Sequence, residues 1–378
     1  MKVSCLQENL AKGLGIVGRA VSPRSTLPVL GNILVATDGG RLKLSATDLE
    51  VGITCWIGAK VEETGATTVP SRTFIDLVST LPPGLVDMEL IVRTQTLNLR
   101  AARSEANIKG IDAQEFPIVA APDEDAKGIP IDPGVLRAAI EQVAFAAATD
   151  ESRPILTGVL AQFENEELTL AAADGFRLSV RTVRLDDAIS DPFRIIIPAS
   201  ALTELRRVSS DQDEPIIVRV TPERNQVIFE LTDVLLVSQL IDGTFPDYRQ
   251  IIPRERHTHS VLGTAPFLKA CKMAQIFARD AANISRIQID PGSGLEPGRL
   301  RVSATAAETG EDVSELDASI EGEAIEIAFN VKYLIDVLSV ISAPQVSLDT
   351  TTASSPGVIR QVGDELFTHV IMPMHLGQ

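Results

Sequence analysis

The feature that most limits how this chain can fold is an internal repeat. Three short motifs recur three times, in the same order, along its 378 residues. The first motif reads LSATD, LAAAD and VSATA at residues 44–48, 170–174 and 302–306. The second opens a helical pattern at residues 69–71, 197–199 and 329–331, and the third is Phe116-Pro117, Phe245-Pro246 and Met372-Pro373. Copies lie 126 to 132 residues apart, which predicts three versions of one structural unit.

The first copy contains the same order of elements twice. A strand at Lys2–Leu6, a helix at Gln7–Val21 and three further strands are followed by a strand, a helix at Ser71–Leu81 and three more strands. Aliphatic residues dominate, as expected for strands that pack against helices. We therefore expect an α+β fold of three repeated domains, each with two helices packed on antiparallel sheets. Polar segments near 120–128 and 253–259 place the expected domains at 1–125, 126–253 and 254–378.

The charge of the chain is unevenly distributed. A formal net charge of −17 by itself argues against nucleic acid as a partner. The six expected helices nevertheless carry +6, which leaves −23 on the remainder; they span residues 7–24, 70–81, 133–149, 199–208, 266–279 and 331–342. Such helices could neutralise phosphates, or their bases could simply occupy exposed helix faces.

One motif suggests an enzyme. Residues 13–18 read GLGIVG, and Asp38 follows 20 residues after Gly18, as in a dinucleotide-binding site. An NAD-dependent enzyme using Gly13, Gly15 and Gly18 is therefore one alternative. However, apolar residues continue at helical spacing through the glycines, and the second copy has no glycine at the matching positions. The pattern favours glycines that allow close helix packing.

Other reactive residues form no recognisable catalytic or metal site. The three cysteines, Cys5, Cys55 and Cys271, are far apart and odd in number, which fits a reducing cytosol better than a disulfide framework. Asp48 and Asp174 occupy matching repeat positions, where a turn or cap residue is more common than a catalytic one. No signal peptide or long apolar run is seen, so we expect a cytoplasmic protein without a cofactor.

Several longer segments resemble the bacterial DNA sliding clamps, the beta subunits of DNA polymerase III. The resemblance runs in order through the whole chain, in SPRSTLPVLGNILV (22–35), SATDLEVG (45–52), ADGFRLSV (173–180), QLIDGTFPDYRQIIP (239–253), FNVKYLIDVL (329–338) and VIMPMHL (370–376). It implies a head-to-tail homodimer whose six domains form a ring around duplex DNA. Such a ring slides without sequence preference and tethers the replicative polymerase, the clamp loader and repair proteins through short peptides. A repeat scaffold that never touches DNA is the other alternative.

The resemblance also implies roles for individual residues. Arg24 and Arg153 match loop residues beside DNA, although Pro154 stands where the family usually has an aromatic residue. Together with bases of the expected helices they form the predicted DNA-facing set: Arg24, Arg72, Arg137, Arg153, Arg206, Lys269 and Lys332. The predicted dimer contact consists of Ile108, Ile276 and Phe277, for which ordinary core packing is the alternative.

A peptide-binding pocket for partners is expected between the second and third domains. By position it is lined by Leu156, Ala173, Gly175, Phe176, Arg177, Leu178, Pro246, Ile251, Val346, Val370, Met372, Pro373, Met374 and Leu376. Ala173 and Phe176 replace residues that are usually polar, and Gly377-Gln378 extend past the usual end, so we expect a more apolar pocket. The alternative is that Met372 and Met374 fill the core of the third domain.

Overall fold

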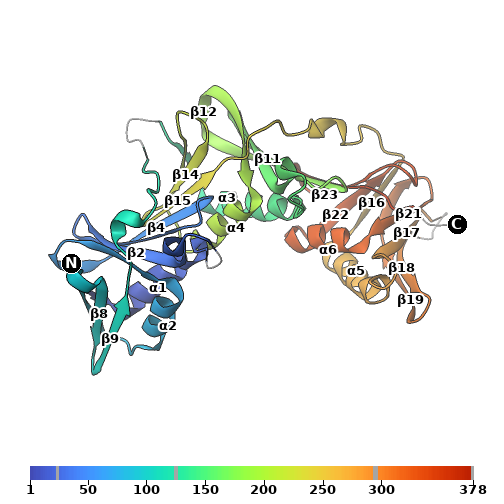
Figure 1. The fold of residues 1–378 in the computed structure, drawn as a ribbon. Coiled ribbons are helices and arrows are strands. Elements are labelled where there is room, and N and C mark those ends of the chain that lie inside the picture. The colour runs from blue at the N-terminus through green and yellow to red at the C-terminus, as the bar shows by residue number, and fades with distance from the viewer. Residues whose placement is uncertain (23–24, 123–126, 293–296, 376–378) are drawn as a thin grey trace. The chain divides into compact units, whose positions relative to one another are not determined.

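The structure is a computed structural model that describes residues 1–22, 25–122, 127–292 and 297–375 (Figure 1). The chain divides into two compact units, described separately below. Unit 1 comprises Met1–Gly134 and Ser200–Leu240, and unit 2 comprises Val135–Ala199 and Ile241–Gln378. Each unit thus contains one outer repeat and part of the middle repeat.

Unit 1 holds two antiparallel sheets. The five-stranded sheet has the order β5 (Ala59–Glu63), β1 (Lys2–Leu6), β7 (Leu85–Ile91), β8 (Thr96–Ala101) and β9 (Ser104–Lys109). The eight-stranded sheet has the order β10 (Ile129–Ile131), β13 (Ile216–Val220), β14 (Gln226–Glu230), β15 (Val234–Gln239), β4 (Val51–Ile57), β3 (Arg41–Thr47), β2 (Asn32–Asp38) and β6 (Ala66–Pro70). Because β15 pairs with β4, strands from the first and second repeats share one sheet.

Unit 2 repeats this arrangement with a seven-stranded and a four-stranded sheet. The larger sheet has the order β11 (Gly158–Ala173), β12 (Arg177–Pro198), β24 (Asp364–Ile371), β23 (Gly357–Gln361), β22 (Gln345–Thr350), β16 (Thr258–Gly263) and β20 (Ser319–Gly322). The smaller sheet has the order β19 (Gly310–Asp317), β18 (Arg299–Ala306), β17 (Ile284–Asp290) and β21 (Ile325–Asn330). The β12–β24 pairing joins strands of the second and third repeats.

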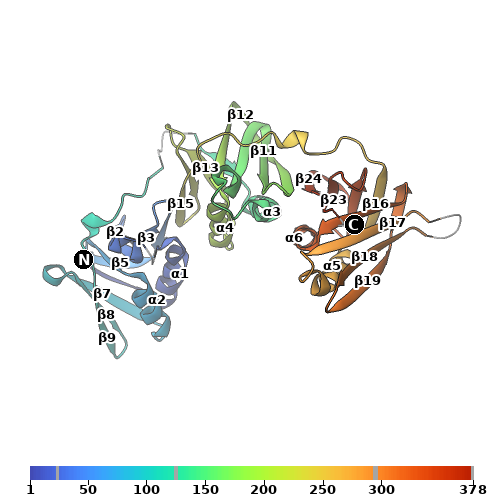
Figure 2. The same ribbon diagram turned by 45° about the vertical axis from the view of Figure 1, so that its right-hand side comes forward.

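The six expected helices are confirmed within the described residues. They are α1 (Gln7–Val17), α2 (Ser71–Thr80), α3 (Pro133–Val143), α4 (Ala199–Val208), α5 (Thr264–Ala278) and α6 (Val331–Val340). In unit 1, α1 lies beside α2 and against β3 and β4; in unit 2, α5 lies beside α6 and against β17, β18 and β19 (Figure 2). The cause is amphipathic spacing, which buries Leu10, Leu14 and Val17 on one face of α1.

The glycines of the GLGIVG motif lie in and directly after a helix. Gly13 and Gly15 are inside α1, and Gly18 begins a short 3-10 turn. A Cβ atom on Gly13 would lie 2.9 Å from Leu44 Cδ1, and one on Gly18 would lie 2.8 Å from Ile75 Cδ1. These two glycines therefore allow close packing, whereas Gly15 has open space beside it. The NAD-binding alternative requires the glycines at the turn from strand to helix, but β1 passes into α1 at Leu6 and Gln7, before the first of these glycines.

The cores are aliphatic and hold all three cysteines. Burial raises the pKa of the Cys5 thiol to about 12 and that of Cys55 to about 11, and it also raises the pKa of Cys271. Thiols with such raised pKa values are poor nucleophiles at neutral pH, because the thiolate is scarce. In the described parts of the chain, no helix has the length and apolar character needed to cross a membrane.

Candidate functional site

The predicted partner pocket is built around a turn between β11 and β12 in unit 2. Asp174 closes this turn, because its Oδ1 accepts hydrogen bonds from the backbone N–H groups of Phe176 and Arg177 at 2.8 and 3.0 Å. Gly175 has a φ of +94°, which a glycine adopts without strain. The prediction that the repeated aspartate is a turn residue is confirmed at this position.

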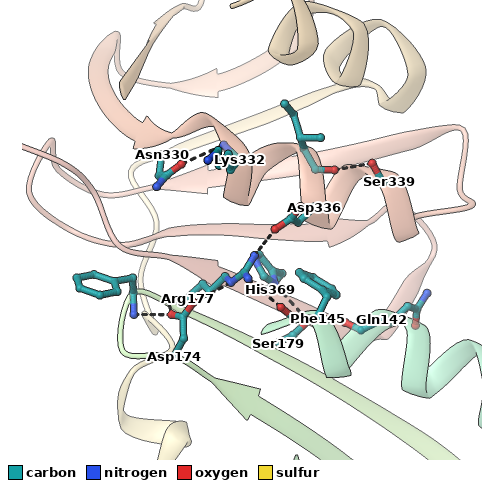
Figure 3. Close-up of polar contacts among 12 residues, drawn as sticks. Gln142, Phe145, Asp174, Arg177, Ser179, Asn330, Lys332, Asp336, Ser339 and His369 are labelled. Atoms are coloured by element: carbon teal, nitrogen blue, oxygen red, sulfur yellow. Dashed lines mark hydrogen bonds and ion pairs between the residues drawn. The ribbon is translucent and has the colours of Figure 1, made fainter. Parts of the chain in front are cut away.

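Arg177 fastens the turn to two other segments (Figure 3). Its Nε lies 3.0 Å from Asp174 Oδ2, and its Nη2 donates to the carbonyl oxygen of Phe145 at 2.8 Å. Nη1 donates to Asp336 Oδ2 on α6 at 2.5 Å. The guanidinium also lies 4.5 Å from the ring centre of Tyr333 on α6. A side chain held by charge-assisted hydrogen bonds on all three nitrogens has little rotational freedom.

The C-terminal segment runs beside the same turn. The strand β24 ends at Ile371, and the next N–H group, of Met372, donates to the carbonyl oxygen of Phe176 at 2.8 Å. Pro373 has no N–H group, and Met374 N donates to the carbonyl oxygen of Ala328 at 2.8 Å. Met372 therefore continues the β12–β24 hydrogen bonding at the turn, whereas Met374 is bonded to β21.

The predicted pocket residues divide into a buried floor and an exposed group. The floor contains Ala173, Leu178 and Val370, which pack with Phe245 and Tyr248 and with the partly buried Leu156. The exposed group is called here the Phe176 surface; it consists of Phe176 (58 % exposed), Ile251 (39 %), Met372 (38 %) and Pro246.

Three predicted pocket residues belong neither to the buried floor nor to the Phe176 surface. Val346 is fully buried in another cluster, beneath α5 and α6, so it contributes no exposed surface. Met374 is half-buried, with its backbone bonded to β21. Leu376 lies outside the described residues, as do Gly377 and Gln378.

A buried polar group lies directly behind Arg177. Ser179 Oγ donates to the carbonyl oxygen of Gln142 at 2.6 Å, and His369 Nδ1 lies 3.2 Å from the same Oγ. Since the Ser179 proton is used by Gln142, Nδ1–H of His369 is the donor to Ser179. Burial, together with the nearby Arg177 charge, lowers the pKa of His369 to about 3. The ring also stacks on Phe145, with 5.5 Å between ring centres.

The sequence did not predict the contributions of Asp336, Tyr333 and Phe145. Asp336 was visible only as an acidic residue one turn after Lys332, and no pattern connects it with Arg177, 159 residues earlier. The two meet because β12 and β24 share a sheet, a pairing between repeats that self-comparison does not reveal.

The predicted DNA-facing bases have different environments. In unit 1, Arg72 is 94 % exposed and lies 3.8 Å from Asp76, whereas Arg206 is half-buried and has an interaction partner. In unit 2, Arg137 is half-buried and also has a partner. Arg153 is exposed, but its Nη1 donates to the carbonyl oxygen of Asp174 at 2.9 Å, which places it at the turn. Arg24 lies outside the described residues.

Lys269 on α5 and Lys332 on α6 are the two lysines of the predicted DNA-facing set, and both belong to unit 2. Both side chains are exposed, and neither ammonium forms an ion pair with any residue that the structure describes. Asp336 is occupied by Arg177, so it does not neutralise Lys332.

The residues of the predicted dimer contact differ in how far their side chains are exposed. Ile108 lies on β9, at the edge of the five-stranded sheet, but only 5 % of it is exposed. Phe277 is half-buried and packs against the core beneath α5. Ile276 is 55 % exposed, and the nearby helix residue Met273 is 41 % exposed. Val313, 62 % exposed on the edge strand β19, adds apolar surface that the sequence did not identify.

Comparisons with known proteins agree along the whole chain. Models of the N-terminal, central and C-terminal domains of the DNA polymerase III beta subunit match residues 1–120, 130–247 and 249–375. The beta sliding clamp of Bacillus subtilis (strain 168) is 33 % identical over 387 aligned residues, with 99 % of each chain covered. The beta sliding clamp of Synechococcus elongatus is 32 % identical over 381 residues, with 100 % of each chain covered.

Solved structures give the same result. The crystal structure of the DNA polymerase sliding clamp from B. subtilis has a TM-score of 0.93 and 30 % identity, with complete coverage of both chains. A sliding clamp from Pseudomonas aeruginosa bound to griselimycin has a TM-score of 0.91 and 29 % identity, also with complete coverage.

Proposed function

The chain belongs to the DNA polymerase III beta-subunit family, the bacterial sliding clamps, and we propose that it is the processivity factor of a replicative DNA polymerase. Two copies, joined head to tail, form a ring that encircles duplex DNA. The ring slides without sequence preference and tethers polymerase, clamp loader and repair proteins. It is an accessory subunit and not an enzyme.

The observation that carries this proposal is the match of all three family domains, in order, over the whole chain. Those matches also support the domain division at 1–125, 126–253 and 254–378.

Ring closure is supported by two open sheet edges. The strands β9 and β19 each end a sheet, and unpaired strand edges are available for pairing with a second chain. Ile276 and Met273 expose apolar surface on α5, which packs against β19. We propose that β9 of one copy meets β19 of the other, with Ile276 as the main apolar anchor. Ile108 then stabilises β9 from inside its own domain.

DNA is held by topology and by weak phosphate contacts. The six expected helices carry a net +6 on a chain of −17, so a DNA-facing set of bases coexists with a repulsive acidic remainder. Lys269 and Lys332 best support this role in unit 2, because neither is neutralised within the described residues. We further propose that the protein works at the nucleoid, where its DNA partner lies.

Partner proteins are proposed to bind the Phe176 surface. An exposed phenylalanine and an exposed methionine, joined through the Met372–Phe176 backbone hydrogen bond, offer an apolar platform over a buried floor. Short peptides that carry a glutamine and spaced apolar residues fit this chemistry. Methionine adapts its shape, which suits a surface with several partners.

The test uses the intact protein and a clamp loader with nicked circular DNA. We expect the protein to stay on circles through gel filtration and to leave after the circles are cut into linear duplex. Equal retention on both forms would contradict topological binding. Failure to bind either form would favour the scaffold alternative. Sedimentation should give about 81 kDa, twice the 40.5 kDa chain.

A further inference from the structure

We propose that Asp336 on α6 is a positioning residue for partner binding, acting through Arg177 on the Phe176 surface. This inference rests on the proposed peptide-binding function of that surface. Asp336 does not belong to the exposed group, and it acts from α6, which also carries Lys332 near its start. Figure 3 shows Asp336 directed toward Arg177, on the side away from Asp174.

Two residues of α6 contact the guanidinium of Arg177. Asp336 Oδ2 accepts from Arg177 Nη1 at 2.5 Å, and the ring centre of Tyr333 lies 4.5 Å from the guanidinium carbon. The Arg177 side chain is 11 % exposed and that of Asp336 is 44 % exposed, so water screens the Coulomb attraction only from the Asp336 side. The hydrogen bond to the carboxylate and the contact with the aromatic ring together restrict the position of the guanidinium.

Arg177 is connected by hydrogen bonds to the Phe176 surface. The same guanidinium bonds through Nε to Asp174 Oδ2, whose other oxygen bonds to the N–H groups of Phe176 and Arg177. The carbonyl oxygen of Phe176 then accepts from Met372. Two exposed members of the Phe176 surface, Phe176 and Met372, therefore depend on one turn, and α6 holds that turn through one arginine.

The first repeat provides an internal comparison. Asp48 closes the equivalent turn, since its Oδ1 accepts from the N–H groups of Glu50 and Val51 at 2.9 and 2.7 Å. Val51 occupies the place of Arg177, so this turn has no such link to a helix. Asp76, which matches Asp336 in the repeat, lies 3.8 Å from the exposed Arg72. The turn itself needs only its aspartate, and the connection to α6 is an addition in the second and third repeats.

The experiment measures binding of a fluorescein-labelled peptide, with one glutamine followed by spaced leucine and phenylalanine residues, to the full-length protein by anisotropy. Asp336→Asn is expected to weaken binding about tenfold, and the matched control Asp76→Asn less than about twofold. Melting temperatures establish that each variant is folded.

A double-mutant cycle separates positioning from a general structural effect. In an Arg177→Lys background, Asp336→Asn should cause much less than its tenfold loss, because the residues act through one another. An unchanged loss in that background, or wild-type affinity of the Asp336→Asn protein, would overturn the inference. If the wild-type protein itself fails to bind the peptide, the proposed function of the Phe176 surface fails first, and that result is distinguishable from the others.

Discussion

Deletion of the residues after Ile371 tests whether the C-terminal segment completes the partner surface. The position of the cut follows from the structure. Val370 and Ile371 are each 1 % exposed and pair with β12, so a cut before them would remove part of the core. A cut after Ile371 removes the exposed Met372 and the half-buried Met374 and leaves β24 complete.

The structure gives the expected magnitudes. Met372 is 38 % exposed, so a bound peptide can cover only part of that side chain, and the lower end of the usual range applies: about 1 kcal/mol per methionine. Two methionines then correspond to roughly thirtyfold weaker peptide binding. The deletion also removes the backbone hydrogen bonds from Met372 and Met374, for a loss of about 2 kcal/mol of stability.

Calorimetry with the glutamine-containing peptide, together with thermal melting and sedimentation, checks this prediction. The truncated protein should remain a folded dimer with weakened peptide binding. Val362→Ala is the control, because Val362 is 45 % exposed in the same unit and lies at the turn before β24. Unchanged peptide affinity, or loss of the cooperative melting transition, would show that the methionines serve the core and not the partner surface.

Three further predictions concern the dimer, the DNA contact and pH. Ile276→Ser should weaken each subunit interface by about 1 kcal/mol or more, seen as a shift toward monomer on dilution in sedimentation; an unchanged dimer would exclude this residue from the interface. Replacing Lys269 and Lys332 by Glu should slow loading onto circular DNA without lowering the melting temperature, and equal loading would remove both from the DNA-facing set. The folded-state pKa of His369, about 3, lies below its ordinary value of 6.5, so stability should fall as pH falls from 7 to 5.5, by about 1 kcal/mol. His369→Gln should abolish that part of the slope in urea melts at the two pH values, and an unaltered slope would show that His369 is not its source.

The sequence predicted helices and turns well because apolar spacing and turn residues indicate the same local structure. The apolar spacing in α1 continues through Gly13, and the structure places that glycine within the helix. The repeat also identified Asp48 and Asp174 as turn residues, and both carboxylates accept two backbone N–H groups. A capped turn needs only neighbouring residues, so its signature is readable in a short segment.

What the sequence did not predict depends on contacts between distant segments. Nothing in β4 indicates that its partner is β15, and nothing in β12 indicates that β24 lies beside it. The contact of Arg177 with Asp336 follows from the second of these pairings. The sequence also did not predict which side chains are exposed. Ile108 and Ile276 have the same side chain, yet Ile108 is 5 % exposed and Ile276 is 55 % exposed. Burial depends on which elements cover a residue, and periodicity alone does not specify the covering element.

Comparison of the two aspartate turns shows how a repeated fold produces one specialised surface. In both repeats the residue after the aspartate has a positive φ, +80° at Leu49 and +94° at Gly175. In both, the next carbonyl oxygen accepts a hydrogen bond at 2.8 Å from a residue at the end of a strand in the following repeat: Glu50 from Gln239 at the end of β15, and Phe176 from Met372 directly after β24. The backbone of the two turns is therefore the same, and the difference lies in the side chains. At the two hydrogen-bonded positions the first turn has glutamate and glutamine, next to the exposed Leu49, whereas the second has phenylalanine and methionine. We therefore expect the proposed partner peptide to prefer the second turn, where both hydrogen-bonded residues have apolar side chains.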